Sequence, residues 1–369
     1  MDKPLAGLKV VELARVLAGP WAGQLLADLG AEVVKVERPG TGDDTRQWGP
    51  PFAADGASAY FHSCNRGKRS LAIDLETAEG QAQVRALAAE ADVLIENFKV
   101  GGLARYGLDH PSLAAINPRL VYCSITGFGQ TGPYAARAGY DFIVQGMGGA
   151  MSLTGEPDGP PQKSGIAYAD LFTGLYATVA VLAALRDRDG RGKGAHIDMA
   201  LLDTQVAVLA NQALNWMVSG DVPTRMGNGH SNLVPYQAFR VADGEIIVAV
   251  GNDRQFERLC GLLGLEALVG DDRFRTNPAR VVNRAALIPL IEQAMAGRGL
   301  RELSEALEAA GIPAGPINAV DSVFADPQVV HRGLRIDGET PGLASPIVID
   351  GRRQVARAPA PRLGEHGPC

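Results

Sequence analysis

The sequence is poor in the residues that hold metal ions or build disulfide frameworks. Its 369 residues include four cysteines, and no two of them stand in CxxC spacing: Cys64, Cys123, Cys260 and Cys369. Such a set indicates neither a disulfide framework nor a thiolate zinc site, and it fits a reducing compartment. The six histidines are scattered too, the nearest two, His196 and His230, being 34 residues apart. We therefore expect no metal site and a cytoplasmic protein.

An excess of positive charge and a long apolar run are missing as well. Lys and Arg total 35 against 41 Asp and Glu, which gives a formal net charge of −6. Proteins that bind nucleic acid or anionic membranes usually carry a basic excess. The chain begins M-D-K-P, without the basic and apolar pattern of a secretory signal. The longest apolar stretch, Leu171 to Leu185, is shorter than the ~18–20 residues that cross a bilayer. We expect no nucleic-acid partner and no membrane partner, and interpret this stretch as a buried helix.

Apolar residues are plentiful enough for a full core, at 46% of the chain against 21% charged. The length is more than twice the ~150 residues of an average domain, which favours two domains. In the first two hundred residues, strand-like runs alternate with helical spacing at residues 20–29 and 77–91. The strand-like runs cover residues 8–13, 32–37, 70–75, 92–95 and 120–125. This alternation predicts an α/β fold with a mostly parallel sheet, whose ligands bind beyond the carboxyl ends of the strands.

The second half of the chain has a different pattern. A long helix is predicted over Leu201–Met217, followed by a smaller α+β unit. Its hairpin pairs residues 236–241 with 245–250 around the turn Asp243-Gly244, and helices follow near 254–263, 278–296 and 300–309. We predict a large domain over 1–200, a connecting helix and linker over 201–225, a small domain over 226–318, and a return to the large domain over 319–369.

The segment Gly127–Gly132 matches the GxGxxG pattern of dinucleotide-binding folds and follows a predicted strand. Pro133 and Tyr134 come directly after it, where such a fold needs the start of a helix to face the pyrophosphate. We interpret the segment as a structural glycine turn, and expect neither NAD nor flavin.

Several basic residues fall at predicted strand ends and in the loops that follow them. Any one of them is most often a solvated surface residue, but together they favour a phosphate-bearing ligand held by charge-assisted hydrogen bonds. The set is Arg15, Arg38, Arg46, Lys68, Arg69, Arg105 and Arg137.

Asp170 stands at the start of the most apolar helical segment in the chain. A carboxylate there can be an N-cap, accepting backbone N–H groups and suiting the helix dipole. The same carboxylate, surrounded by apolar groups, can be a nucleophile. Likewise, the glycine-rich segments Gly146–Gly149 and Gly227–His230 can be simple turns or a mobile cover over a site.

Several motifs, in order over nearly the whole chain, resemble those of the class III CoA-transferases. This group includes formyl-CoA transferase, carnitine-CoA transferase and methylacyl-CoA racemase. The motifs are Gly19-Pro20, Val36–Gly40, Gly42–Arg46, Asn65–Ser70, Glu96–Phe98, Gly127–Tyr134 and the segment around Asp170.

The resemblance implies a Rossmann-like large domain with a mostly parallel sheet built from both chain ends, a smaller α+β domain, and an interlocked homodimer. The family's nucleophilic aspartate falls on Asp170. The glycine loop of the formyl-CoA enzyme falls on Gly227, Asn228, Gly229 and His230, of which only two are glycine. The family's contacts to coenzyme A fall on Leu17, Ala18, Arg38, Ile73, Asp74, Leu75, Asn97, Phe98, Lys99, Arg105, Arg137, Ala138, Gly139 and Tyr140.

The implied reaction moves CoA from an acyl-CoA to a free carboxylic acid, through an aspartyl acyl anhydride and an enzyme–CoA thioester. The segments 230–239 and 251–256 are similar to the branch that exchanges CoA between succinate and other short dicarboxylates, with Arg46 and His230 as candidates for the distal carboxylate. We expect Asp170 to be ionised at neutral pH, with a pKa near ~3.9.

Two other functions stay open. Racemases of the group carry a Gly-His-Asp motif, whereas this chain has Gly139-Tyr140-Asp141. A phenol with a pKa of ~10 is a poor base near neutral pH, which disfavours an acyl-CoA racemase or epimerase. A CoA-binding homologue without catalytic activity is the other alternative.

Overall fold

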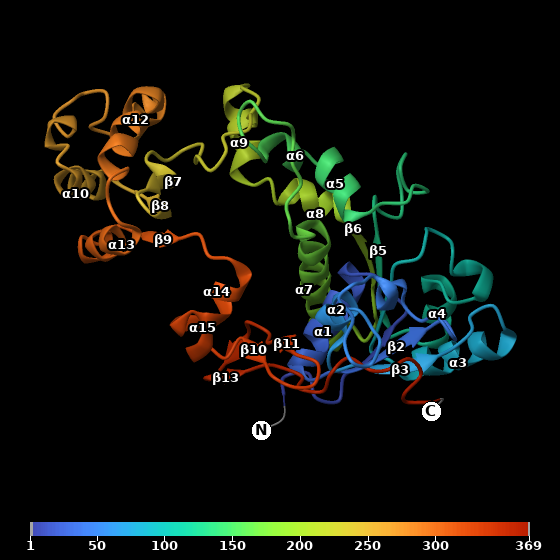
Figure 1. Cartoon of the computed structure of the whole chain (residues 1–369). Helices are drawn as coiled ribbons and strands as arrows, with labels where there is room; N and C mark the ends of the chain where they lie inside the picture. The colour runs from blue at the N-terminus through green and yellow to red at the C-terminus, as the bar shows by residue number, and fades with distance from the viewer. Residues whose placement is uncertain (1–2, 368–369) are drawn as a thin grey trace. The chain divides into compact units, whose positions relative to one another are not determined.

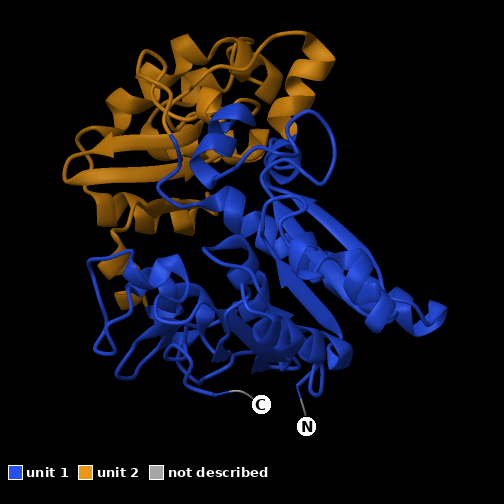
Figure 2. Ribbon diagram, turned by 90° about the vertical axis from the view of Figure 1, so that its right-hand side faces the viewer, with its two compact units in different colours: residues 1–150, 163–210, 327–369 blue, residues 151–162, 211–326 orange. Residues whose placement is uncertain are grey.

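The structure is a computed structural model that describes residues 3–367, so Cys369 lies outside the described part of the chain. Contacts within the chain divide it into two compact units (Figure 2). Unit 1 holds residues 1–150, 163–210 and 327–369, and unit 2 holds residues 151–162 and 211–326. The domain boundaries expected from the sequence, and the independent folding of the domains, stay predictions.

A six-stranded parallel sheet forms the centre of unit 1 (Figure 1). Its order β3-β2-β1-β4-β5-β6 is the Rossmann order. All five strands predicted from the sequence are present, with ends shifted by up to three residues, whereas β6 was not predicted because its sequence HIDMA alternates polar and apolar residues. The strands are β1 Lys9–Glu12, β2 Glu32–Glu37, β3 Arg69–Ala72, β4 Val93–Glu96, β5 Val121–Thr126 and β6 His196–Ala200.

Helices cover both faces of this sheet because its strands are apolar on both sides. Val93 and Ile95 point into a core shared with α1 (Ala18–Leu29) and α7 (Tyr168–Arg191). Leu94, between them, points into the opposite core, which α3 (Ala78–Glu90) and α4 (His110–Ile116) complete. The prediction of a parallel sheet covered on both faces is confirmed.

Helix α7 is longer than the helix predicted from the apolar stretch Leu171 to Leu185. At 24 residues it is, in the described part of the chain, the one helix whose length and composition would let it cross a membrane. The expectation of a stretch too short to span was therefore wrong on length. One side of α7 is buried in the core through Ala177, Val181 and Leu185, while Leu175 and Val179 are exposed. The interpretation as a core helix thus holds for one face only.

The C-terminal segment of unit 1 packs against the rest of that unit but adds no strand to the six-stranded sheet. The sheet is therefore not built from both chain ends, although unit 1 is. The segment forms α15 Pro327–His331 and two small hairpins, β10 Arg335–Ile336 with β11 Gly342–Leu343, and β12 Val348–Ile349 with β13 Arg352–Arg353. The short elements elsewhere in unit 1 are η1 Asp44–Gln47, α2 Ala59–Asn65, η2 Ala104–Tyr106 and α5 Asp141–Met147. Helix α6, Ala150–Leu153, begins at the end of its first segment.

The single helix predicted over Leu201–Met217 is broken into two. Helix α8 spans Leu201–Ala207 and belongs to unit 1, whereas α9 spans Asn211–Ser219 and belongs to unit 2. Between them Ala210 has φ 46°, a left-handed conformation that no helix interior contains. Apolar periodicity continues across the break, so the sequence pattern did not reveal it.

Unit 2 is a small α+β unit, as predicted. The hairpin of β7 (Tyr236–Val241) and β8 (Gly244–Ala249) is confirmed, and β9 (Ala314–Pro316) pairs with β8 from the other side. The helix expected over 278–296 is interrupted at Asn283, between α11 and α12. The helices of unit 2 are α10 Asp253–Leu263, η3 Glu266–Leu268, α11 Asn277–Val282, α12 Arg284–Met295, α13 Leu300–Ala309 and α14 Val320–Ala325.

Candidate active site

A cavity of about 930 Å³ opens at the carboxyl ends of the strands in unit 1. It is lined by the residue directly after each of five strands: Leu13 after β1, Arg38 after β2, Ile73 after β3, Asn97 after β4 and Gly127 after β5. This is the edge at which parallel α/β sheets bind their ligands, and the volume is that of a site for a small molecule or cofactor.

The same cavity collects the residues to which the sequence resemblance assigned coenzyme A. Although they come from six separate segments, all fourteen line it, and so does Asp170. Their roles stay predictions, but the fold brings these residues to one place: Leu17, Ala18, Arg38, Ile73, Asp74, Leu75, Asn97, Phe98, Lys99, Arg105, Arg137, Ala138, Gly139 and Tyr140.

Five cationic side chains face this cavity. Arg38 and Lys99 are exposed and form no ion pair with any residue in 3–367. Arg105 lies over the ring of Tyr106, and Arg137 lies 4.5 Å from the ring centroid of Tyr134. The fifth, Arg15, is paired with Asp44 at 3.1 Å and was named only among the scattered basic residues. Four of the seven basic residues singled out from the sequence therefore gather where phosphates could bind.

Two other basic residues of that set have structural roles. Arg46, proposed for the distal carboxylate of the substrate, is 8% exposed, and its Nε and Nη2 each donate to the Glu37 carboxylate at 2.7 Å. It does not line the cavity, and its role toward the substrate stays a prediction. Lys68 is also buried, and its ammonium donates to Glu12 and to the Pro20 carbonyl. In sequence, Arg46 and Lys68 look like the basic residues of the cavity. They differ in the structure, because each has a buried carboxylate beside it.

Asp170 is the third residue of α7 and does not cap the helix. The N-cap residue is Ala167, without a side-chain hydrogen bond. The cap comes instead from Asp141, the first residue of α5: its Oδ1 accepts the backbone N–H of Ala169 at 2.9 Å and that of Asp170 at 3.3 Å. The N-cap interpretation of Asp170 is therefore wrong. Its carboxylate makes no hydrogen bond with the described residues and borders the cavity.

Burial raises the pKa of Asp170 to about 7, and the nearby negative charge of Asp141 adds to the shift. The expectation of an ordinary, fully ionised aspartate is corrected by this environment. Burial and the charge of Asp170 also raise the pKa of Tyr60, which lies on α2. A carboxylate with a raised pKa is a stronger base and nucleophile once it has lost its proton.

The GxGxxG segment forms a turn, as interpreted. Helix α5 begins only at Asp141, nine residues after Gly132, so no helix N-terminus follows the motif directly. The first glycine of the motif serves close packing: a Cβ on Gly127 would lie 2.6 Å from Cα of Gly139, and a Cβ on Gly139 would lie 2.5 Å from Cα of Gly127. This crossing holds the segment 137–140 at the rim of the cavity.

Comparisons with known proteins agree with this geometry. The family model for CoA-transferase family III matches residues 5–367. The chain belongs to this family. The succinate–glutarate CoA-transferase of Agrobacterium fabrum is 56% identical over 98% of this chain and 94% of its own length. The human succinyl-CoA:glutarate CoA-transferase is 43% identical, over 99% of this chain and 84% of the human protein. A solved structure of a CAIB/BAIF family protein from Brucella suis is 58% identical and superposes with a TM-score of 0.89 over all of this chain and 98% of that one.

One turn in the wall of this CoA-transferase cavity is strained. Val16, between β1 and α1, has φ 72°. A β-branched residue rarely adopts this conformation, which costs about 1–3 kcal/mol. The turn leads directly into Leu17 and Ala18, which line the cavity, and no sequence pattern indicated it.

The segment Gly227–His230 belongs to unit 2, where it is tied to its surroundings. Gly227 donates its N–H to the Gly155 carbonyl, and the His230 carbonyl accepts from Arg284. Nδ1 of His230 accepts the backbone N–H groups of Asn232 and Leu233. The roles predicted for Gly227, Asn228, Gly229 and His230 toward the substrate stay predictions.

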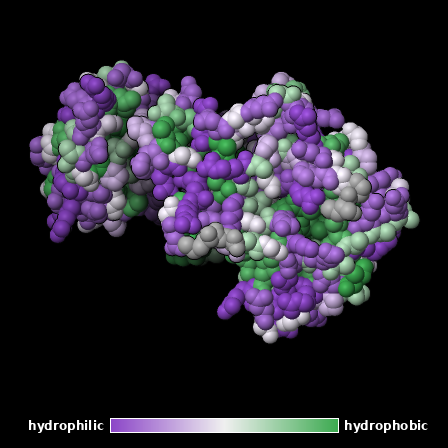
Figure 3. All heavy atoms as spheres, turned by 90° about the horizontal axis from the view of Figure 1, so that it is seen from below, coloured by the Kyte–Doolittle hydropathy of each residue, from purple (hydrophilic) through white to green (hydrophobic). Residues whose placement is uncertain are grey.

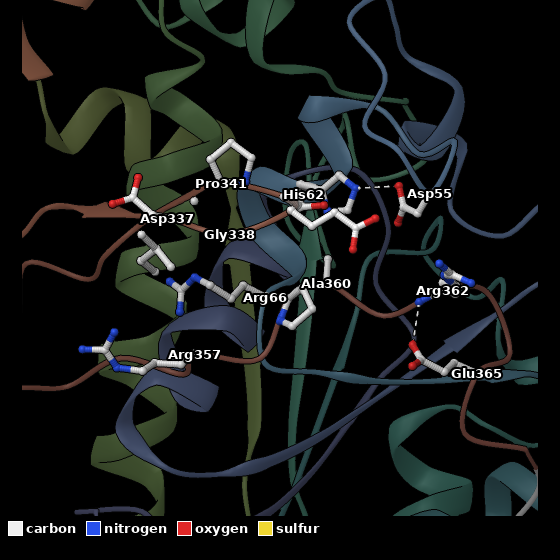
Figure 4. A pocket seen from close by; sticks show the side chains of 15 residues that line it. Asp55, His62, Arg66, Asp337, Gly338, Pro341, Arg357, Ala360, Arg362 and Glu365 are labelled. Carbon is white, nitrogen blue, oxygen red and sulfur yellow. Dashed lines mark hydrogen bonds and ion pairs between the residues drawn. The ribbon is translucent and has the colours of Figure 1, made fainter.

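A second, smaller cavity of about 220 Å³ lies in unit 1 between α2 and the C-terminal segment (Figure 4). Both acidic and basic side chains line it, including the pair of His62 with Asp55 at 3.1 Å. Arg66, which also borders it, is already paired with Asp28. None of the predicted site residues lines this cavity. Within residues 3–367, no three His, Cys, Asp or Glu side chains gather as a metal site.

Proposed function

We propose that this chain transfers CoA from succinyl-CoA to a short dicarboxylic acid, with glutarate as the first acceptor to test. The observation that carries the proposal is that Asp170 and all fourteen predicted CoA residues line one cavity. The names of the most similar relatives, succinate–glutarate and succinyl-CoA:glutarate CoA-transferase, support the choice of acids.

The proposed reaction uses Asp170 as a covalent nucleophile. Its carboxylate attacks the thioester carbonyl, the C–S bond breaks, and a mixed anhydride forms with release of the CoA thiolate. The thiolate then attacks the aspartyl carbonyl, which gives an Asp170–CoA thioester and frees succinate. The acceptor carboxylate attacks that thioester and again forms an anhydride and thiolate. Attack of the thiolate on the acceptor's carbonyl yields the new acyl-CoA and restores Asp170, so no atom or charge is left over.

The residues of the cavity fit the two demands of this chemistry. The CoA phosphates need cations, which Arg15, Arg38, Lys99, Arg105 and Arg137 offer at the cavity wall. The anhydride must be kept from water, because hydrolysis would waste the acyl-CoA. We propose that binding of the remote CoA moiety holds the thioester against Asp170 throughout.

The geometry favours transfer over racemisation. A racemase of this group would need a second proton acceptor at Tyr140 or Asp141. Tyr140 is an exposed phenol, and the Asp141 carboxylate is occupied as the cap of α7 and as the acceptor of a hydrogen bond from Gln145. A CoA-binding homologue without activity is disfavoured by the unpaired carboxylate of Asp170.

We also propose that the protein works in the cytoplasm as an interlocked homodimer. Cys64, Cys123 and Cys260 are buried free thiols, which suits a reducing compartment. The exposed apolar residues of α5 and α7 are an argument for a second copy, because a monomer rarely leaves such a face in water. The segment 201–217 adds no such argument, because the break at Ala210 divides it into two short helices.

The test is CoA exchange between unlabelled succinyl-CoA and labelled glutarate with the purified protein. We expect labelled glutaryl-CoA in the wild type, and turnover lower by about a thousandfold in Asp170→Asn, the scale for loss of a covalent nucleophile. Hydroxylamine added during turnover should leave a hydroxamate at residue 170. The matched control is Asp187→Asn, a half-exposed aspartate on the same helix that pairs with Arg191.

Each failure has its own meaning. Turnover in Asp170→Asn near the wild-type rate contradicts the covalent scheme. A clear preference for butyrate over dicarboxylates contradicts the proposed acceptors. Exchange of the α-proton of an acyl-CoA with D₂O, without CoA exchange, indicates a racemase, and CoA binding with neither reaction indicates a binding homologue.

A further inference from the structure

The turn from Leu13 to Leu17 is held almost entirely by side chains. The Asn97 amide binds both polar backbone groups of Arg15: Oδ1 accepts its N–H at 2.9 Å, and Nδ2 donates to its carbonyl at 2.6 Å. Both carboxylate oxygens of Asp43 lie 3.3 Å from the Val16 nitrogen and accept its N–H. Asn97 and Asp43, which come from two different parts of the chain, thus hold the peptide unit that directly precedes the strained φ angle of Val16.

Asp43 is held in turn by a buried ionic network. It is 1% exposed, and its Oδ2 lies 2.9 Å from Nζ of Lys35. Lys35 is completely buried, and the same ammonium donates to the Ala14 carbonyl at 2.8 Å and to Glu12 at 3.1 Å. Burial alone would lower the pKa of Lys35, but Asp43 and Glu12 outweigh it and keep the lysine charged. Buried charges of this kind persist only when each has its partners.

The turn matters because it leads into the wall of the cavity. Leu17 and Ala18 line the same cavity as Asp170, and the N-terminal end of α1 packs closely on α7. A Cβ on Gly174, one turn after Asp170, would lie 2.5 Å from the Ala18 carbonyl oxygen. A shift of the turn would therefore displace the cavity wall that faces the nucleophile.

We propose that Asp43 and Asn97 are positioning residues, which hold the strained Val16 turn so that Leu17 and Ala18 stay in register with Asp170. The proposal rests on the proposed function of the cavity. It gives Asn97 a different task from the CoA contact that the sequence resemblance implied, because both polar atoms of its side chain are used by Arg15. It also gives a structural role to the Gly42–Arg46 motif that resembles the family's, because Asp43 belongs to that motif.

The central test is rescue. Asp43→Asn keeps the shape of the side chain but removes its charge, so the turn loses its anchor to Lys35. We expect kcat for CoA exchange to fall by about ten- to a hundredfold, the cost of a misplacement near 1 Å, while the dissociation constant of CoA, measured by calorimetry, changes less than about threefold. Adding Val16→Gly should restore most of the lost kcat, because glycine adopts a positive φ without strain.

The matched control is Asp28→Asn. Asp28 is equally buried and charged, but it lies at the other end of α1 and pairs with Arg66. We expect Asp28→Asn to lower the melting temperature, and Val16→Gly to give no recovery of activity in that background. Recovery there would mean that Val16→Gly acts through general stability, and would overturn the proposal.

A second variant covers the case in which Asp43→Asn does not fold. In Asn97→Asp, a carboxylate oxygen replaces the amide nitrogen that donates to the Arg15 carbonyl, and the two oxygens repel. We expect kcat for CoA exchange to fall by about ten- to a hundredfold, and Val16→Gly to restore most of it, because glycine relaxes the turn that Asn97 holds. A kcat in Asn97→Asp equal to that of the wild type would contradict the positioning role of Asn97.

Failure of this inference can be told from failure of the proposed function. If the wild type lacks CoA exchange, the proposed function is wrong, but the melting temperatures still test the turn: Asp43→Asn should cost less stability in the Val16→Gly background than in the wild type. If exchange is present and Val16→Gly rescues neither kcat nor stability, the positioning role is wrong while the proposed function stands.

Discussion

The burial of Asp170 lowers the stability of the folded protein at neutral pH and favours its proposed role as a nucleophile. Its pKa of about 7 lies above the value of ~3.9 that the unfolded chain has. The folded protein therefore holds this proton more tightly, and its stability falls as the pH rises from about 4 through 7. Replacing Asp170 with Asn should accordingly raise the melting temperature at pH 8 while lowering turnover by about a thousandfold.

The pH dependence of activity follows from the same shift. In the proposed reaction only ionised Asp170 can attack, so kcat/KM for succinyl-CoA should fall about tenfold for each pH unit below 7. In Asp141→Asn the neighbouring charge is gone, the pKa of Asp170 falls, and the acid limb of the profile should move to lower pH. The Asn oxygen can still accept the N–H of Ala169, so the cap is retained. A profile with its limb unmoved in Asp141→Asn contradicts this electrostatic account.

Arg38 provides the residue-scale test of CoA binding. Because it is exposed at the cavity and has no carboxylate partner among residues 3–367, a phosphate can use its whole guanidinium. Arg38→Ala should weaken CoA binding by about 1.5–3 kcal/mol in calorimetry, the scale of a hydrogen bond between charged groups. Arg240→Ala, on the exposed hairpin of unit 2, is the control and should leave the affinity as it is. Equal affinity in Arg38→Ala and wild type would remove Arg38 from the site.

At the residue scale, the sequence located the cavity but did not predict what the residues around the cavity do. The strand ends could be predicted because apolar runs and helical spacing alternate, and the motifs sit at those ends. The sequence could not predict that Arg38 lines the cavity while Arg46 is buried in an ion pair. The partner of Arg46 is Glu37, which the strand pattern presents as an ordinary surface charge. The strain at Val16 and the cap from Asp141 depend on contacts across 27 or 28 residues, which periodicity does not encode.

Among the elements, α7 shows how a glycine can fix a distance between two helices. Gly174 lies against α1, where a Cβ would meet the Ala18 carbonyl at 2.5 Å and the Trp21 side chain at 3.1 Å. Gly174→Ala should separate the helices, destabilise the protein by about 1–3 kcal/mol and lower kcat, since Asp170 lies one turn away. Gly190→Ala, in the same helix, has no atom within 4 Å of the new Cβ. It should be neutral or stabilising by up to about 1 kcal/mol, as for glycine replaced within a helix. Equal chemical-denaturation midpoints for the two variants would contradict this account.

The elements of unit 2 were predicted better than the connection that leads to it. Turn residues and alternation specify the hairpin of β7 and β8 locally, so its register follows from Asp243-Gly244. The break at Ala210 has no glycine, proline or polar cluster to mark it. Such a break depends on where each half of the helix finds its apolar partners, which a single sequence does not state.

At the scale of the whole molecule, the exposed apolar surface is the feature that a monomeric state does not explain. Figure 3 shows hydrophobic side chains reaching the surface between hydrophilic ones on the face that it draws. On α7 and α5 the exposed set comprises Phe142, Ile143, Met147, Phe172, Leu175, Tyr176 and Val179, each more than 40% exposed. Exposed apolar side chains gathered on two helices that contact each other are typical of an obligate interface.

The proposed homodimer predicts a specific response to charge on that surface. Val179→Glu should shift the protein from dimer to monomer or aggregate in sedimentation velocity at micromolar concentration, because a buried, unpaired carboxylate is costly at an interface. Val282→Glu, on α11 of unit 2, introduces the same change at a valine that is 83% exposed and should leave the dimer intact. A wild type that sediments as a monomer at nanomolar concentration and remains active contradicts the interlocked dimer.

The cap of α7 by Asp141 has a consequence for how the protein can be observed. Tyr140, a rim residue of the cavity, directly precedes the aspartate whose carboxylate accepts the N–H of Ala169. The amide proton of Ala169 is therefore a natural reporter, connected to the rim on one side and to the proposed nucleophile, Asp170, on the other. Its hydrogen-exchange rate should slow when coenzyme A orders residues 137–140, and a deuterium label there would record occupancy of the cavity without any measurement of catalysis.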